Sequence, residues 1–95
     1  MNDEDILRIG SFEFRSRLFT GTGKYPDPET ARAALRESGC EVVTVAVRRV
    51  DLADRTPDSI IGILLQGGYT ILPNTAGCYT VEDAVRTARL AREML

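Results

Sequence analysis

The chain has 95 residues, enough for one domain at most. Apolar residues make up 43% and charged residues 27% of it, the proportions of a soluble globular protein. The net charge of −2 argues against a general nucleic-acid or membrane-surface binder, since both carry a basic excess. No apolar run approaches the roughly 18 residues of a membrane span, and the acidic start MNDEDILRIG lacks the apolar core of a signal peptide. These features predict a cytoplasmic protein that binds neither nucleic acid nor membrane.

The two cysteines, Cys40 and Cys78, lie far apart in the sequence, and the chain has no histidine. Without a CxxC pair or an imidazole, the sequence offers no set of zinc ligands. In a reducing compartment both cysteines are expected to be free thiols. We therefore expect no metal and no cofactor.

Residues 6–17 are predicted to form a β-hairpin around a two-residue turn at Gly10 and Ser11. One face of this hairpin is then apolar, and the other carries an opposite-charge pair, which makes the register self-consistent. The turn sets three facing pairs: Ile9 with Phe12, Arg8 with Glu13, and Leu7 with Phe14.

Three repeats of strand, loop and helix follow over residues 18–95. Apolar and β-branched strands are expected at 18–22, 41–47 and 69–73, with a period of about 25 residues. Strands that alternate with helices at this spacing form βα units with a parallel sheet. Such units build either a barrel, which needs eight of them and roughly 250 residues, or a doubly wound sheet.

Each helix has a start signal. Asp27 followed by Pro28, and Thr56 followed by Pro57, are typical of a cap and a first helical residue. Thr80 begins a capping-box pattern for the third helix. Its apolar face is expected at Val81, Ala84, Val85, Ala88, Ala91 and Leu95. The second helix is expected to turn Ile60, Ile61, Leu64 and Leu65 inward.

A three-stranded parallel sheet has two open edges and too few helices to cover both faces. Its apolar strands predict that more structure packs there. We therefore expect these residues to belong to a longer polypeptide or to be covered by other copies.

Ligands bind at the carboxyl ends of the strands in parallel α/β folds. Here those ends are three short loops. Their cations and hydrogen-bonding groups suit a small anionic substrate, such as a phosphate or carboxylate. The alternative is that the arginines pair with the nearby acids Asp51 and Asp54. The substrate-binding candidates are Thr22, Gly23, Lys24, Arg48, Asn74 and Thr75, and Arg49 completes the cationic rim.

The stretch LFTGTGKY, residues 18–25, holds the only lysine of the chain. A dinucleotide fingerprint needs a third glycine where Pro26 stands, and a P-loop needs Ser or Thr where Tyr25 stands. Both motifs fail, which favours a tight turn from strand to helix. The loop position of Lys24 favours a rim residue over a buried catalytic amine.

Three stretches, in order, resemble the N-terminal part of thiazole synthase, the thiamin-biosynthesis enzyme. The stretches are SRLFTGTGKYPD at 16–27, TVAVRRVDL at 44–52 and ILPNTAGCYTVEDAVRTARLARE at 71–93. The hairpin precedes them as in the family, and the resemblance covers most of residues 6–94. It implies that residues 1–95 are the N-terminal portion of one (βα)₈ TIM-barrel domain, with the hairpin at 6–17 closing its bottom and three βα units at 18–95.

The resemblance also implies a transferase activity. Members form thiazole phosphate from 1-deoxy-D-xylulose 5-phosphate, dehydroglycine and sulfur, which arrives as a thiocarboxylate on a sulfur carrier protein. They are homo-oligomers, and a lysine forms a Schiff base with the sugar ketone. That lysine is expected beyond Leu95, so we expect no catalytic residue within this chain and no activity from it alone. The other readings are a non-catalytic half-barrel fragment that assembles with itself or a partner, and a different sugar-phosphate barrel enzyme.

Overall fold

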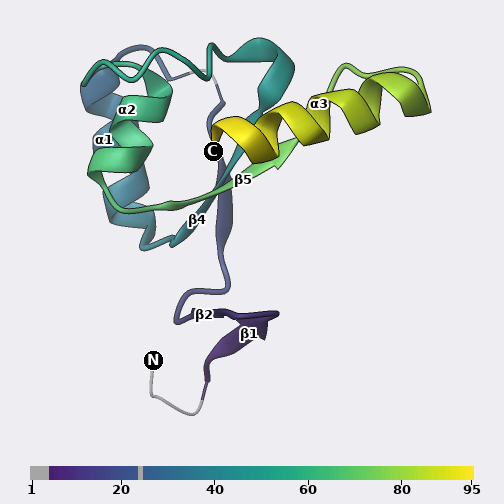
Figure 1. Ribbon diagram of the computed structural model, residues 1–95. Helices are drawn as coiled ribbons and strands as arrows, with labels where there is room; N and C mark the ends of the chain where they lie inside the picture. Colours follow the sequence, from purple (N-terminus) through teal and green to yellow (C-terminus); the bar gives the residue numbers. More distant parts are fainter. Residues whose placement is uncertain (1–4, 24) are drawn as a thin grey trace.

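The computed structural model describes residues 5–23 and 25–95 (Figure 1). β1 and β2 form an antiparallel pair, and β3, β4 and β5 form a parallel sheet in that order. The chain is thus a mixed α/β structure, and each strand of the sheet lies within one residue of its predicted bounds. The elements are β1 (Leu7–Ile9), β2 (Phe12–Phe14), β3 (Phe19–Gly21), α1 (Pro28–Ser38), β4 (Val42–Ala46), the 3₁₀ turn η1 (Val47–Arg49), α2 (Ile60–Gln66), β5 (Thr70–Asn74) and α3 (Val81–Met94).

The hairpin has the predicted register, with Leu7 opposite Phe14 and Ile9 opposite Phe12. Gly10 has a φ of 58°, the left-handed conformation that the first residue of such a turn requires. The charged pair forms as well, since Arg8 Nε donates to Glu13 Oε1 at 3.1 Å. The local sequence therefore specifies this element completely.

Two contacts attach the hairpin to the sheet, although the hairpin projects away from the helices (Figure 1). The Phe14 ring meets the Phe19 ring of β3 edge-on, with centroids 6.1 Å apart. Oε1 of Glu41, just before β4, accepts the backbone N–H groups of Arg15 and Ser16 at 2.9 and 3.1 Å. The hairpin is thereby held at the amino ends of β3 and β4.

All three helices contribute to one apolar core on a single face of the sheet. Val43 and Val45 of β4 are fully buried there, and α1 and α2 lie side by side on one side of β4 (Figure 1). The other buried members of the core are Ala31, Leu35, Cys40, Val47, Leu52, Ile61, Ile63, Leu64 and Ala91.

The register assigns a second set of side chains to the opposite face of the sheet. Thr44 and Leu72 are neighbours on that face, and Leu72 is 44% exposed. No helix in the described ranges covers this face, as expected because the chain has too few helices to cover both faces of the sheet. This face leads directly to the carboxyl ends of the strands, where the predicted site residues lie.

α1 begins and ends where its sequence signals place it. Asp27 Oδ1 accepts the backbone N–H of Thr30 at 2.7 Å, and Pro28 is the first helical residue. This bond lowers the pKa of the Asp27 carboxyl below its usual value. Gly39 ends the helix with a φ of 69°.

α2 begins later than the sequence predicts, so the expected start at Thr56 and Pro57 is wrong. Its cap is Ser59, whose Oγ accepts the backbone N–H of Gly62 at 3.0 Å. Thr56 instead opens a turn, because its carbonyl accepts the Ser59 N–H at 3.0 Å. Proline suits the second position of such a turn as well as the first position of a helix, and the dipeptide does not distinguish the two.

Two helical faces also differ from expectation. Leu65 of α2 is 48% exposed. On α3, Val81 is 80% exposed, Val85 and Leu95 are exposed too, and the fully buried residue is Ala91. The apolar residues of α3 occupy more than one side of the helix, and α3 contacts β5 and η1 with Ala91 buried. None of the helices in the described ranges is both long and apolar enough to span a bilayer.

Candidate functional site

The carboxyl ends of the parallel strands border a hollow of about 380 Å³, here called the strand-end hollow. Thr22, Gly23 and Asn74, three of the predicted site residues, line it together. Lys24 falls outside the described residues. The rest of the lining comes from Thr44, Ala46, Arg49, Val50 and Ala76.

The two arginines of the second loop serve different places. Arg48 Nη1 donates to the carbonyl oxygen of Gly77 at 2.9 Å, so Arg48 ties the second loop to the third. Arg49 lines the strand-end hollow and, within the described ranges, has no ion pair. Successive side chains of a 3₁₀ turn diverge by about 120°, which separates these neighbours. A binding role for Arg48 stays a prediction.

The third loop is organised by its own polar groups. Asn74 Oδ1 accepts the backbone N–H of Ala76 at 3.1 Å, which orients the Asn74 amide beside the hollow. The Thr75 carbonyl accepts the backbone N–H of Cys78 at 3.1 Å. Thr75 is half-buried and is not among the described residues that line the hollow.

The nearby acids use their oxygens within their own loop. Asp51 Oδ1 accepts the backbone N–H of Ala53 at 3.0 Å. Asp54 Oδ1 accepts the hydroxyl and the backbone N–H of Thr56 at 2.7 and 3.2 Å. These bonds, the hydroxyl above all, lower the pKa of the Asp54 carboxyl. In the described chain, neither acid forms an ion pair with the loop arginines.

A second hollow, of about 370 Å³, lies on the helix side of the same loops and is called the helix-side hollow. It shares Thr22, Gly23 and Val50 with the strand-end hollow. The first loop and α1 form one wall, and the segment that leads into α2 forms the other. The remaining lining residues are Tyr25, Pro26, Asp27, Pro28, Ala31, Asp58, Ile60 and Ile63.

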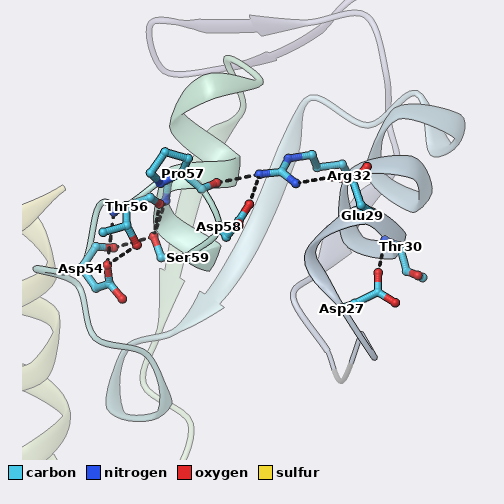
Figure 2. Close-up of polar contacts among 10 residues, drawn as sticks. Asp27, Glu29, Thr30, Arg32, Asp54, Thr56, Pro57, Asp58 and Ser59 are labelled. Atoms are coloured by element: carbon cyan, nitrogen blue, oxygen red, sulfur yellow. Dashed lines mark hydrogen bonds and ion pairs between the residues drawn. The ribbon is translucent and has the colours of Figure 1, made fainter.

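Arg32 of α1 connects these two walls, and Figure 2 shows its side chain directed at Pro57 and Asp58. Arg32 Nη2 donates to the Pro57 carbonyl at 2.8 Å and to Asp58 Oδ1 at 2.7 Å, while Nη1 donates to Glu29 Oε1 at 2.8 Å. The bond to Asp58 raises the pKa of Arg32 above its usual value. Sequence patterns do not reveal this role, because the partners of Arg32 on the other wall lie 25 and 26 positions away.

Both cysteines are free. The hydroxyl of Thr20 donates to the buried Cys40 sulfur at 3.1 Å, and the Cys78 thiol donates to the Thr87 hydroxyl at 3.4 Å. Within 5–23 and 25–95, no cluster of three or more histidine, cysteine or acidic side chains is arranged to hold a metal.

These observations define a class: an α/β protein of parallel βα units with a hollow, lined by an arginine and an amide, at the strand carboxyl ends. The chain belongs to the family described as thiazole biosynthesis protein ThiG, whose model matches residues 8–95. It is 64% identical over 90 residues to a thiazole synthase of Sorangium cellulosum and 57% identical over 89 residues to one of Geobacter metallireducens. These alignments cover 95% and 94% of this chain but only 35% and 34% of the relatives, so the chain spans about a third of their length.

Proposed function

We propose that these residues form the hairpin and first three βα units of a (βα)₈ TIM-barrel domain that acts as a thiazole synthase in the cytoplasm. The parallel order β3-β4-β5 and the family membership support this proposal. In the proposed reaction, thiazole phosphate forms from 1-deoxy-D-xylulose 5-phosphate, dehydroglycine and the thiocarboxylate sulfur of a sulfur carrier protein. The open face of the sheet would then line the barrel interior.

One observation carries the role of this chain: Arg49 and Asn74, from two different loops, line one hollow at the strand carboxyl ends. The guanidinium of Arg49 is exposed and has no acidic partner among the described residues. An unpaired guanidinium is well suited to a phosphate or carboxylate. We therefore assign this hollow to part of the anionic sugar-phosphate site, with Thr22, Gly23, Lys24, Arg48 and Thr75 as further candidates around it.

Replacing Arg49 tests the assignment. We expect Arg49→Ala to weaken binding of 1-deoxy-D-xylulose 5-phosphate about tenfold, because a hydrogen bond to a charged group is worth about 1.5–3 kcal/mol. The measurement is a calorimetric titration of both proteins with the sugar phosphate. Arg36→Ala, which removes an exposed arginine of α1, is the control and should bind as the unchanged protein does. Equal affinities for Arg49→Ala and the unchanged protein would contradict the assignment.

The Schiff-base step is assigned to a lysine other than Lys24, which we place on the rim to hold an anionic substrate or a partner. The 95-residue polypeptide alone is then expected to form no thiazole phosphate. The measurement is product detection by chromatography after incubation with the sugar phosphate, dehydroglycine and the carrier thiocarboxylate. Turnover by pure 95-residue protein, with no longer chain detected by mass spectrometry, would show this expectation to be wrong.

A second candidate, a half-barrel module that assembles with itself or a partner, is favoured by the open sheet face. Leu72 on that face is 44% exposed, and both outer strands of the sheet have an unpaired edge within the described chain. Exposed apolar strands with free edges promote association. Sedimentation separates the two candidates, because a clean monomer with a cooperative thermal transition would contradict assembly.

A further inference from the structure

We propose that Arg32 is a positioning residue, which holds the first and second strand-end loops at a fixed separation and so sets the shape of the strand-end hollow. This inference deepens the proposed function and rests on it. Arg32 lines neither the strand-end hollow nor the helix-side hollow. Its effect on anion binding would therefore be indirect.

Arg32 contacts both walls of the helix-side hollow. Arg32 is on α1, directly after the first loop, and its two partners Pro57 and Asp58 belong to the segment that leads from the second loop into α2. Its side chain is only 26% exposed, and Glu29 one turn earlier holds the other guanidinium nitrogen at 2.8 Å. The Arg32 guanidinium is thus oriented by Glu29 of its own helix and bonded to the segment that leads into α2.

Residues 51–59, here called the α2 entry segment, are joined to one another by hydrogen bonds (Figure 2). The Ser59 hydroxyl donates to the carbonyls of Asp54 and Thr56 at 2.7 and 2.8 Å. Gly62 of α2 touches the same Thr56 carbonyl, since a Cβ on Gly62 would lie 1.9 Å from it. The segment therefore moves with α2 as one unit, and Arg32 attaches this unit to α1.

Val50 connects the α2 entry segment to the strand-end hollow. Val50 immediately precedes the segment and lines both hollows, as Thr22 and Gly23 do from the first loop. A change in the separation of α1 and the segment therefore displaces Val50 relative to Gly23. Arg49, the cation of the hollow, is the next residue back along the chain and would be displaced with Val50.

The chemistry of the contact favours arginine over lysine. The planar guanidinium donates in fixed directions to acceptors on both walls, whereas an ammonium group is a single point charge on a flexible stem. Arg32→Lys is therefore expected to keep the charge and lose the fixed geometry. Asp58→Asn keeps the shape of the partner and removes its charge.

The experiment has two arms on the same proteins. In the first, amide hydrogen exchange is expected to rise about tenfold over residues 50–59 in Arg32→Ala, with a smaller rise in Arg32→Lys and Asp58→Asn. Arg36→Ala, one turn along α1 and exposed, is the matched control and should leave this exchange unchanged. Unchanged exchange in both Arg32→Ala and Asp58→Asn would overturn the positioning role.

In the second arm, 1-deoxy-D-xylulose 5-phosphate is titrated into each variant. We expect affinity to fall three- to tenfold in Arg32→Ala and less in Arg32→Lys, with no further loss when Asp58→Asn is added to Arg32→Ala. A purely structural role would lower the unfolding midpoint and leave the affinity of the folded protein unchanged, and that result would overturn the inference. Absence of binding to the unchanged protein would instead contradict the assignment of the strand-end hollow to the sugar-phosphate site, and the exchange arm would still decide whether Arg32 holds the loops.

Discussion

Replacing Gly62 with alanine is expected to destabilise the protein by about 2 kcal/mol. The added Cβ would lie 1.9 Å from the carbonyl oxygen of Thr56 and 3.0 Å from Ser59 Oγ. Alanine gains about 1 kcal/mol over glycine in a helix interior, but overpacking costs about 1–3 kcal/mol, and more where backbone has to move. Here the obstacle is backbone, and the Thr56 carbonyl already accepts the N–H and the hydroxyl of Ser59. Urea unfolding measures the loss as a lower midpoint.

Gly21→Ala is the matched control for this substitution. A Cβ at Gly21 would meet Thr44 Oγ1 at 3.7 Å, an ordinary contact, and Gly21 has no positive φ. We expect its unfolding midpoint to stay close to that of the unchanged protein. A Gly62→Ala protein that is as stable as the Gly21→Ala protein would mean that Thr56 does not contact α2. The α2 entry segment would then not be rigidly coupled to α2, and Arg32 could not position it as proposed.

Much of the fold could be predicted because its signals are local. The turn at Gly10 and Ser11 fixes the hairpin register, and Asp27 with Pro28 fixes the start of α1. The start of α2 could not be predicted in the same way. Thr56 and Pro57 carry the same signal as the start of α1, but Ser59 and the missing side chain of Gly62 move the helix start to Ile60.

The candidate site could be predicted only at the level of its loops. Because strand carboxyl ends share one edge of a parallel sheet, the sequence places Thr22, Gly23 and Asn74 at the same edge, and they do line one hollow. It does not decide between Arg48 and Arg49, because the direction of each side chain depends on a 3₁₀ turn and on the distant Gly77 carbonyl.

The faces of the helices depend on what the sheet offers them. Apolar patterning alone selects Leu64 and Leu65 equally, since both follow the helical period. The structure separates them, because Leu64 is fully buried in the core whereas Leu65 is 48% exposed. The same ambiguity accounts for α3, where Ala91 is buried and Val81 faces outward. Burial at these positions is decided by the packing partner.

Leu64→Ala is expected to cost about 2–5 kcal/mol of the free energy of unfolding, because truncating a buried leucine loses its transfer free energy and leaves a cavity. Leu64 is 0% exposed and belongs to the one core that all three helices share. Domains of this size are stable by only about 5–15 kcal/mol, so this substitution removes a large part of the total. Urea unfolding followed by far-ultraviolet circular dichroism gives the value.

Leu65→Ala is the matched control for Leu64→Ala, because the two leucines are neighbours on one helix and lose the same atoms. For the isolated chain, whose Leu65 is half in solvent, the loss should stay below about 1 kcal/mol. Equal losses at Leu64 and Leu65 would show that Leu65 is covered in solution. Since no described residue covers it, the cover would be a second copy, and the midpoint of the unchanged protein would then rise with protein concentration. The pair of variants therefore measures the core of α2 and tests whether a second copy covers the exposed side of this helix.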